Sequence, residues 1–146
     1  MKKLQKGRSM IEMLGVLAII GVLSIGGLAG YTMAMNRHRA NTVLDFAQRA
    51  LVTAQTAGDN IPFNNVACTD DSVLKGETQP AALASTNGCV VTKTNGLTTV
   101  EVTFSAQPAA DAFAQRAGIT GTIGLQFHMS DENNTWEAGA ATGSGS

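Results

Sequence analysis

The chain has 146 residues, of which 44% are hydrophobic and 14% are charged, and its formal net charge is −1. This length allows one modest domain plus a membrane anchor. The near-neutral charge excludes the strongly basic surface that is typical of nucleic-acid-binding proteins, so the sequence predicts no nucleic-acid partner.

The N-terminal part of the chain is strongly apolar. No charged residue occurs from Met13 to Met35. As a helix, this stretch would span about 34 Å, which is enough to cross the hydrocarbon core of a bilayer. Basic residues flank the stretch on both sides, so charge favours a cytoplasmic N-terminus only slightly. They are Lys2, Lys3, Lys6, Arg8, Arg37 and Arg39.

A cleaved secretory signal peptide is the alternative explanation of this segment. Gly27 and Ala29 could form the pair of small residues that precedes such a cleavage site. The apolar stretch is longer than the core of an ordinary signal peptide, however. A membrane-spanning helix is therefore the preferred interpretation.

Glu12 stands at the head of the apolar stretch. A carboxylate at the bilayer centre costs about 2.5 to 3.5 kcal/mol, and less near the interface, so an acidic residue here suggests a function. A simpler explanation is that Glu12 lies at headgroup depth and interacts with the positive end of the helix dipole. That interaction contributes only about 0.3 to 1 kcal/mol, so we expect Glu12 to have a specific partner.

The string GRSMIEML, from Gly7 to Leu14, follows a short basic leader and opens the long apolar segment. It resembles the prepilin processing signature of type IV pilins and pseudopilins. The resemblance extends from Met1 to about Ala57. It implies that a membrane-embedded aspartyl peptidase cuts between Gly7 and Arg8 and methylates the new amino terminus of Arg8. Glu12 would then be the fifth mature residue, where the family places a glutamate that pairs with the N-terminal amine of a neighbouring subunit.

One residue departs from the family pattern. Pilins usually have phenylalanine, methionine or leucine as the first mature residue, whereas this chain has Arg8. On a helix, the Arg8 guanidinium would lie one turn before Glu12 and could compete with the amine for its carboxylate. Cleavage is still expected, because the glycine at the cut is retained.

The resemblance implies a structural subunit with no enzymatic activity. Such a subunit begins as a single-pass precursor in the bacterial inner membrane and becomes part of an extracellular, homo-oligomeric helical filament. Its partners would be the prepilin peptidase, the pilus assembly machinery and, before assembly, inner-membrane lipid. Within the family, the resemblance suggests a divergent, type IVb-like major pilin.

Three alternatives to a major pilin remain open at this point. The first is a minor pilin or a type II secretion pseudopilin, which carries the same N-terminal signature. The second is a membrane-anchored periplasmic binding module whose helix stays in the bilayer. The third is a secreted hydrolase with a cleaved signal peptide, although the sequence has no recognisable nucleophile constellation for it.

Beyond Met35 the apolar pattern becomes one-sided. Apolar residues recur at steps of three and four, as on one face of a helix: Val43, Leu44, Ala47, Leu51 and Ala54. The sequence therefore predicts one helix from about Ser9 to Ala57, ending at Gly58, a residue type suited to helix termination. The apolar stripe requires a covering layer, which we expect to be a β-sheet.

The two cysteines, Cys68 and Cys89, lie in a polar stretch that is rich in turn-forming residues. One disulfide is the simplest interpretation, and two buried free thiols are the alternative. A disulfide would close a loop of roughly 20 residues, contribute about 3 kcal/mol in the chain-entropy model and imply an oxidising compartment. Many pilins carry a disulfide nearer the C-terminus, so this placement suggests a divergent branch.

The remaining sequence predicts a small antiparallel sheet. Residues 61–88 are expected to form a long loop, and residues 90–94 and 97–104 a hairpin around Asn95–Gly96. A short helix is predicted over Pro108–Ala117, with a further strand in residues 119–129. Trp136 is expected to close the core, and the tail from Ala138 is expected to fray.

These elements define an α+β fold in which the second half of the long helix packs on a three- or four-stranded antiparallel sheet. The expected organisation is a leader over residues 1–7, a membrane and filament-core helix over 8–35, a globular head over 36–137 and a flexible tail over 138–146.

No pattern in the sequence predicts a catalytic residue, a metal site or a cofactor. His38 and His128 are not part of a metal-binding motif, and both are expected at the surface. The acidic pairs Asp70–Asp71 and Asp131–Glu132 are expected to be solvated loops, since Ca²⁺ requires six to eight oxygen ligands in a shaped loop.

Overall fold

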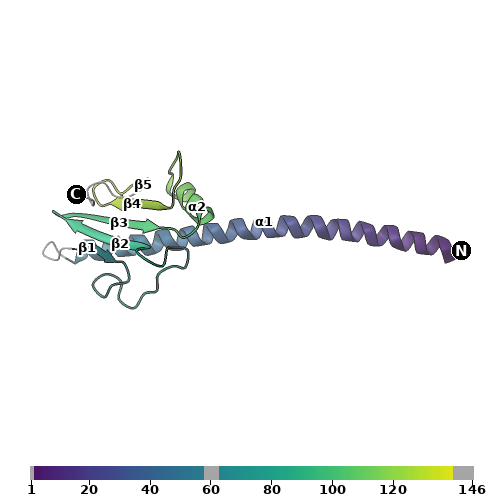
Figure 1. The fold of residues 1–146 in the computed structure, drawn as a ribbon, viewed down its shortest axis with the longest axis horizontal. Helices are drawn as coiled ribbons and strands as arrows, with labels where there is room; N and C mark the ends of the chain where they lie inside the picture. Colours follow the sequence, from purple (N-terminus) through teal and green to yellow (C-terminus); the bar gives the residue numbers. More distant parts are fainter. Residues whose placement is uncertain (1, 58–62, 140–146) are drawn as a thin grey trace. The chain divides into compact units, whose positions relative to one another are not determined.

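The structure is a computed structural model, and it describes residues 2–57 and 63–139, with side chains from Ser9 onward. The chain divides into two compact units, Met1–Met35 and Asn36–Ser146. The first unit is entirely helical in its described part, and the second contains both helix and sheet (Figure 1). The predicted α+β class is confirmed.

Helix α1 extends from Lys2 to Thr56. It begins earlier than the predicted Ser9, because the leader consists largely of lysine, leucine and glutamine, which are good helix formers. Gly7 is the one residue of poor helix propensity before Ser9. The predicted terminating residue, Gly58, lies outside the described residues.

Within the second unit, α1 presents one apolar face to the sheet. Its buried residues recur at three- and four-residue steps, as the sequence pattern predicted. They are Ala40, Val43, Phe46, Ala47, Ala50, Leu51 and Ala54. Four of them are alanines, so the sheet can approach the helix closely. Lys93, buried on the sheet, donates to the Ala54 carbonyl at 3.4 Å, in the last turn of α1.

The sheet has five antiparallel strands in the order β1-β2-β3-β4-β5. They are β1 (Phe63–Ala67), β2 (Cys89–Thr94), β3 (Leu97–Thr103), β4 (Gln126–Ser130) and β5 (Trp136–Ala138). In Figure 1 the strands lie over the C-terminal part of α1. The prediction of three or four strands was therefore too low.

Strand β1 is the main error in the sequence prediction, because residues 61–88 were expected to form only a loop. Asn64 and Asn65 suggested a turn. Asn65 does adopt a left-handed conformation, with φ of 50°, and the β1–β2 register shifts between Phe63 and Val66. Asparagine tolerates the left-handed conformation that is common in turns, and at a β-bulge it can adopt this conformation while the strand continues.

The predicted hairpin is confirmed. Strands β2 and β3 pair continuously from Cys89–Val102 to Thr94–Leu97. The two turn residues, Asn95 and Gly96, have φ values of 55° and 82°. Two successive positive φ values are what a two-residue type I′ turn requires, and Asn-Gly is the pair that adopts them at least cost.

The predicted short helix is also confirmed, as α2 (Gln107–Ala117). Pro108 lies in its first turn, and Gly118 ends it in the left-handed conformation, with φ of 77°. Phe113 of α2 is fully buried among three other aromatic side chains, with ring centroids 5.0 to 5.2 Å away. Those partners are Phe104, Phe127 and Trp136, and Trp136 closes the core as expected.

Two predictions near the C-terminus need correction. The fourth strand begins at Gln126 and not near Ile119, because the chain before it is irregular, with Gly121 at φ of 98° and Leu125 exposed. Ala138 was placed at the start of a frayed tail, yet it belongs to β5, and the Gly139 N–H donates to the Gln126 carbonyl at 2.7 Å. Residues 140–146 lie outside the described part of the chain.

Candidate processing and assembly segment

The described side chains of the first unit lie on a helix, and the large apolar ones from Met10 to Met33 are exposed. Their exposed fractions lie between 52% at Val16 and 74% at Ile25. By its length and composition, helix α1 is long and apolar enough to cross a membrane. Burying such a surface in lipid or against other helices is strongly favourable, since each large apolar side chain gains about 1.5 to 3 kcal/mol.

The three predicted site residues Gly7, Arg8 and Glu12 all lie on α1. The peptide bond between Gly7 and Arg8 is within the helix, and position 12 is about one turn beyond position 8. Glu12 is exposed, and it has no ion-pair partner among the side chains that the structure describes. Glu12 is thus a carboxylate whose charge an additional group could neutralise.

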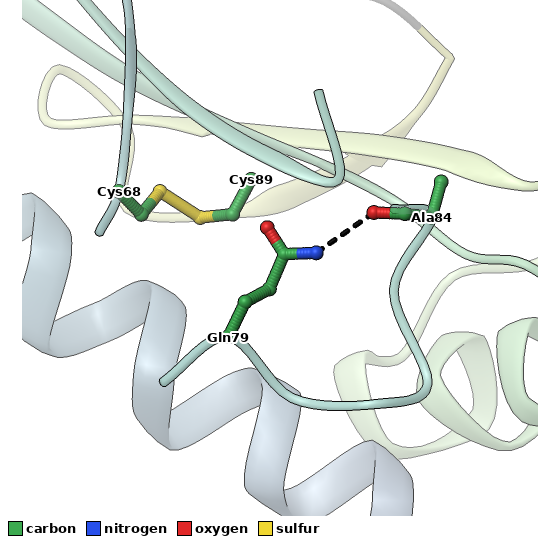
Figure 2. Close-up of a disulfide and its surroundings, with 4 residues drawn as sticks. All are labelled: Cys68, Gln79, Ala84 and Cys89. Atoms are coloured by element: carbon green, nitrogen blue, oxygen red, sulfur yellow. Dashed lines mark hydrogen bonds between the residues drawn. A yellow bond between two sulfur atoms is a disulfide. The ribbon is translucent and has the colours of Figure 1, made fainter. Parts of the chain in front are cut away.

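The two cysteines that were predicted to form a disulfide lie together in the second unit. Cys68 and Cys89 form a disulfide, as Figure 2 shows. Their Cα atoms are 5.4 Å apart, and both residues are fully buried. Backbone hydrogen bonds support this connection, since the Cys68 N–H donates to the Cys89 carbonyl at 3.0 Å. The disulfide joins the end of β1 to the start of β2.

The loop that the disulfide encloses is also fixed by polar contacts. The Gln79 side-chain amide donates to the Ala84 carbonyl at 2.7 Å, as Figure 2 shows. Ala84 in turn donates its N–H to the Thr103 carbonyl at 2.8 Å. A Cβ at Gly88 would lie 2.2 Å from the Ala84 carbonyl oxygen, so this close approach requires glycine. The loop is therefore an ordered part of the head.

The two histidines differ in environment. His38 is exposed, as predicted, but the prediction for His128 was wrong. His128 lies on β4 between β3 and β5, and its side chain is only 11% exposed. Its Nδ1 is 2.8 Å from the Gly139 carbonyl oxygen, and its Nε2 is 3.2 Å from a Glu137 carboxylate oxygen. Strand alternation places His128 on the face opposite Phe127 and Met129, so no local pattern indicates its burial, which accompanies the pairing of β4 with β5.

The acidic pairs contribute to local structure. Asp70 accepts hydrogen bonds from the Ser72 hydroxyl at 2.6 Å and the Ser72 N–H at 2.9 Å, and these bonds lower the pKa of Asp70 below its ordinary value of 3.8. The contribution of this turn to stability is therefore present above that pH and is lost as the pH falls through the lowered pKa. Asp131 accepts a hydrogen bond from the Thr98 N–H at 3.1 Å.

Among residues 2–57 and 63–139, no group of three histidine, cysteine, aspartate or glutamate side chains is arranged to hold a metal ion. Comparison with known proteins identified no matching family model, no matching curated protein and no matching solved structure.

Proposed function

We propose that this chain is the precursor of a structural, non-enzymatic subunit of a type IV pilus-like surface filament. The observation that carries the proposal is the exposed carboxylate of Glu12, which lies on α1 immediately before 23 residues, 13–35, that contain no charge. A carboxylate in that position is costly in lipid unless it meets a partner charge.

Processing would create that partner. Cleavage between Gly7 and Arg8 releases a new amino terminus four residues before Glu12, with or without methylation at Arg8. In a helical stack of identical subunits, the amine of one copy can reach Glu12 of the next. The pair neutralises the carboxylate inside an otherwise apolar filament core, where an unpaired charge is strongly destabilising.

The second unit supports the same role. A compact α+β head with a buried disulfide suits a subunit that is exposed outside the cell, because disulfides persist in oxidising compartments. In this proposal the inner membrane holds the precursor, the prepilin peptidase processes it, and the assembly machinery transfers it to an extracellular pilus. A minor pilin would instead sit at the tip of such a filament, and a type II secretion pseudopilin would form a short pseudopilus.

We expect the chain to appear in the filament fraction sheared from bacteria that express it together with a prepilin peptidase and its assembly machinery. The same cells without the peptidase should keep the chain in the membrane fraction, because the uncleaved leader blocks the amine that pairs with Glu12. Immunoblotting of both fractions measures the distribution. Retention in the membrane fraction of both strains would support a membrane-anchored module instead.

A further inference from the structure

A cavity of about 360 Å³ lies between α1 and α2 within the second unit. Two arginines and two amide side chains surround it, and two alanines leave the space open. The lining residues are Arg37, Ala40, Asn41, Ala112, Gln115 and Arg116. We infer that this cavity binds the phosphate of an anionic phospholipid headgroup.

The charges around the cavity favour an anion. Arg37 and Arg116 form no ion pair with any side chain that the structure describes. Nearby carboxylates on the same helices are occupied elsewhere: Asp45 pairs with Arg49 at 3.2 Å, and Asp111 accepts from the Gln107 amide at 2.8 Å. Two arginines in the lining of one cavity place positive charge beside it, so an anion bound there interacts favourably with both.

The donor chemistry suits a phosphate. Guanidinium groups donate paired N–H bonds whose spacing matches phosphate oxygens, and the Asn41 and Gln115 amides offer further neutral donors. Arg116 also lies in the last turn of α2, where a cation interacts favourably with the helix dipole. The interaction with the α2 dipole can account for an arginine at position 116, but it cannot account for Arg37, which belongs to α1.

The position of Arg37 identifies the source of the phosphate as a lipid. Arg37 follows Met35, the last residue of the uncharged stretch, by two residues, or about 3 Å along the helix. When the stretch spans a bilayer, this position is at headgroup depth. The inference rests on membrane insertion of α1, and it requires neither cleavage at Gly7 nor filament assembly.

Native mass spectrometry of the full-length precursor in mild detergent, titrated with phosphatidylglycerol or phosphatidylcholine, tests this site. We expect the wild-type chain to bind phosphatidylglycerol more tightly. The double variant R37Q/R116Q should bind it about tenfold more weakly or worse, as for the loss of charge-assisted hydrogen bonds. R39Q is the matched control, because Arg39 is exposed on the same helix but does not line the cavity.

The proposed site would be refuted if R39Q lost as much affinity for phosphatidylglycerol as R37Q/R116Q. It would also be refuted if the wild type bound the two lipids equally tightly. If an equal concentration of inorganic phosphate displaced phosphatidylglycerol, the cavity would be a site for free phosphate and not for a lipid headgroup. The fluorescence of Trp136, the only tryptophan, should be the same in all variants, which separates lost binding from unfolding. Because the precursor is used, a failure of processing by the peptidase would not alter any of these results.

Discussion

Replacing Glu12 with alanine should reduce the amount of the chain in sheared filaments by at least about tenfold while leaving cleavage after Gly7 intact. The physical reason is that the variant leaves the N-terminal amine of the neighbouring subunit unpaired in an apolar core, which costs about 3 to 5 kcal/mol for a buried pair. The measurement is an immunoblot of the sheared and membrane fractions, with the leader monitored by its mobility shift.

Two variants separate charge from shape in this experiment. Glu12→Gln keeps the size of the side chain but removes its charge, so it should behave like Glu12→Ala. Asp45→Asn removes an acidic charge from the same helix, where Asp45 is exposed and paired with Arg49, and it should assemble normally. Filaments of normal abundance from Glu12→Gln would refute the pairing of the carboxylate with the amine.

Removal of the disulfide should destabilise the head by about 3 kcal/mol, the chain-entropy value for a loop closed across 21 residues. The change is the double variant Cys68→Ala/Cys89→Ala, because alanine leaves no buried hydroxyl without a partner. Denaturant unfolding of the full-length chain in mild detergent, followed by the fluorescence of the buried Trp136, measures the free energy of unfolding.

Reduction of the wild-type chain provides the control for this measurement. A reductant should lower the stability of the wild type towards that of the double variant and should leave the double variant unchanged. If the double variant and the oxidised wild type unfold at the same denaturant concentration, the disulfide does not hold the loop of residues 68–89 on the sheet. The ordering of that loop would then depend on contacts such as the Gln79–Ala84 hydrogen bond.

Elements with a strong local signal could be predicted from the sequence. The Asn95–Gly96 turn, the Pro108 and Gly118 boundaries of α2, and the apolar stripe on α1 each depend on residues close together in the chain. Their conformations follow from backbone sterics and periodicity, so neighbouring residues are sufficient to predict them.

Elements that depend on tertiary pairing were missed. Strand β1 forms because β2 offers a free edge, although Asn64 and Asn65 are poor strand formers. Strand β5 has only three residues and pairs with β4, and it removes His128 from the surface where the sequence placed it. No local pattern predicts a partner strand, so both required the structure.

The candidate functional residues also differ in whether the sequence alone could predict them. Gly7, Arg8 and Glu12 are recognisable from spacing along one helix, and the structure adds only that the helix is continuous through them. The cavity between Arg37 and Arg116 could not be predicted, because its two cations are 79 positions apart in the sequence and meet only when α2 packs beside α1.

The intact mass of the membrane-extracted chain, expressed with and without a prepilin peptidase, tests the central claim most directly. We expect the peptidase alone to cause loss of residues 1–7, with one methyl group added at Arg8. Retention of the leader in both samples would contradict processing and would leave a membrane-anchored module. Loss of residues 1–29 in both samples would contradict the account more broadly, because a secreted head would then contain neither Glu12 nor the membrane helix.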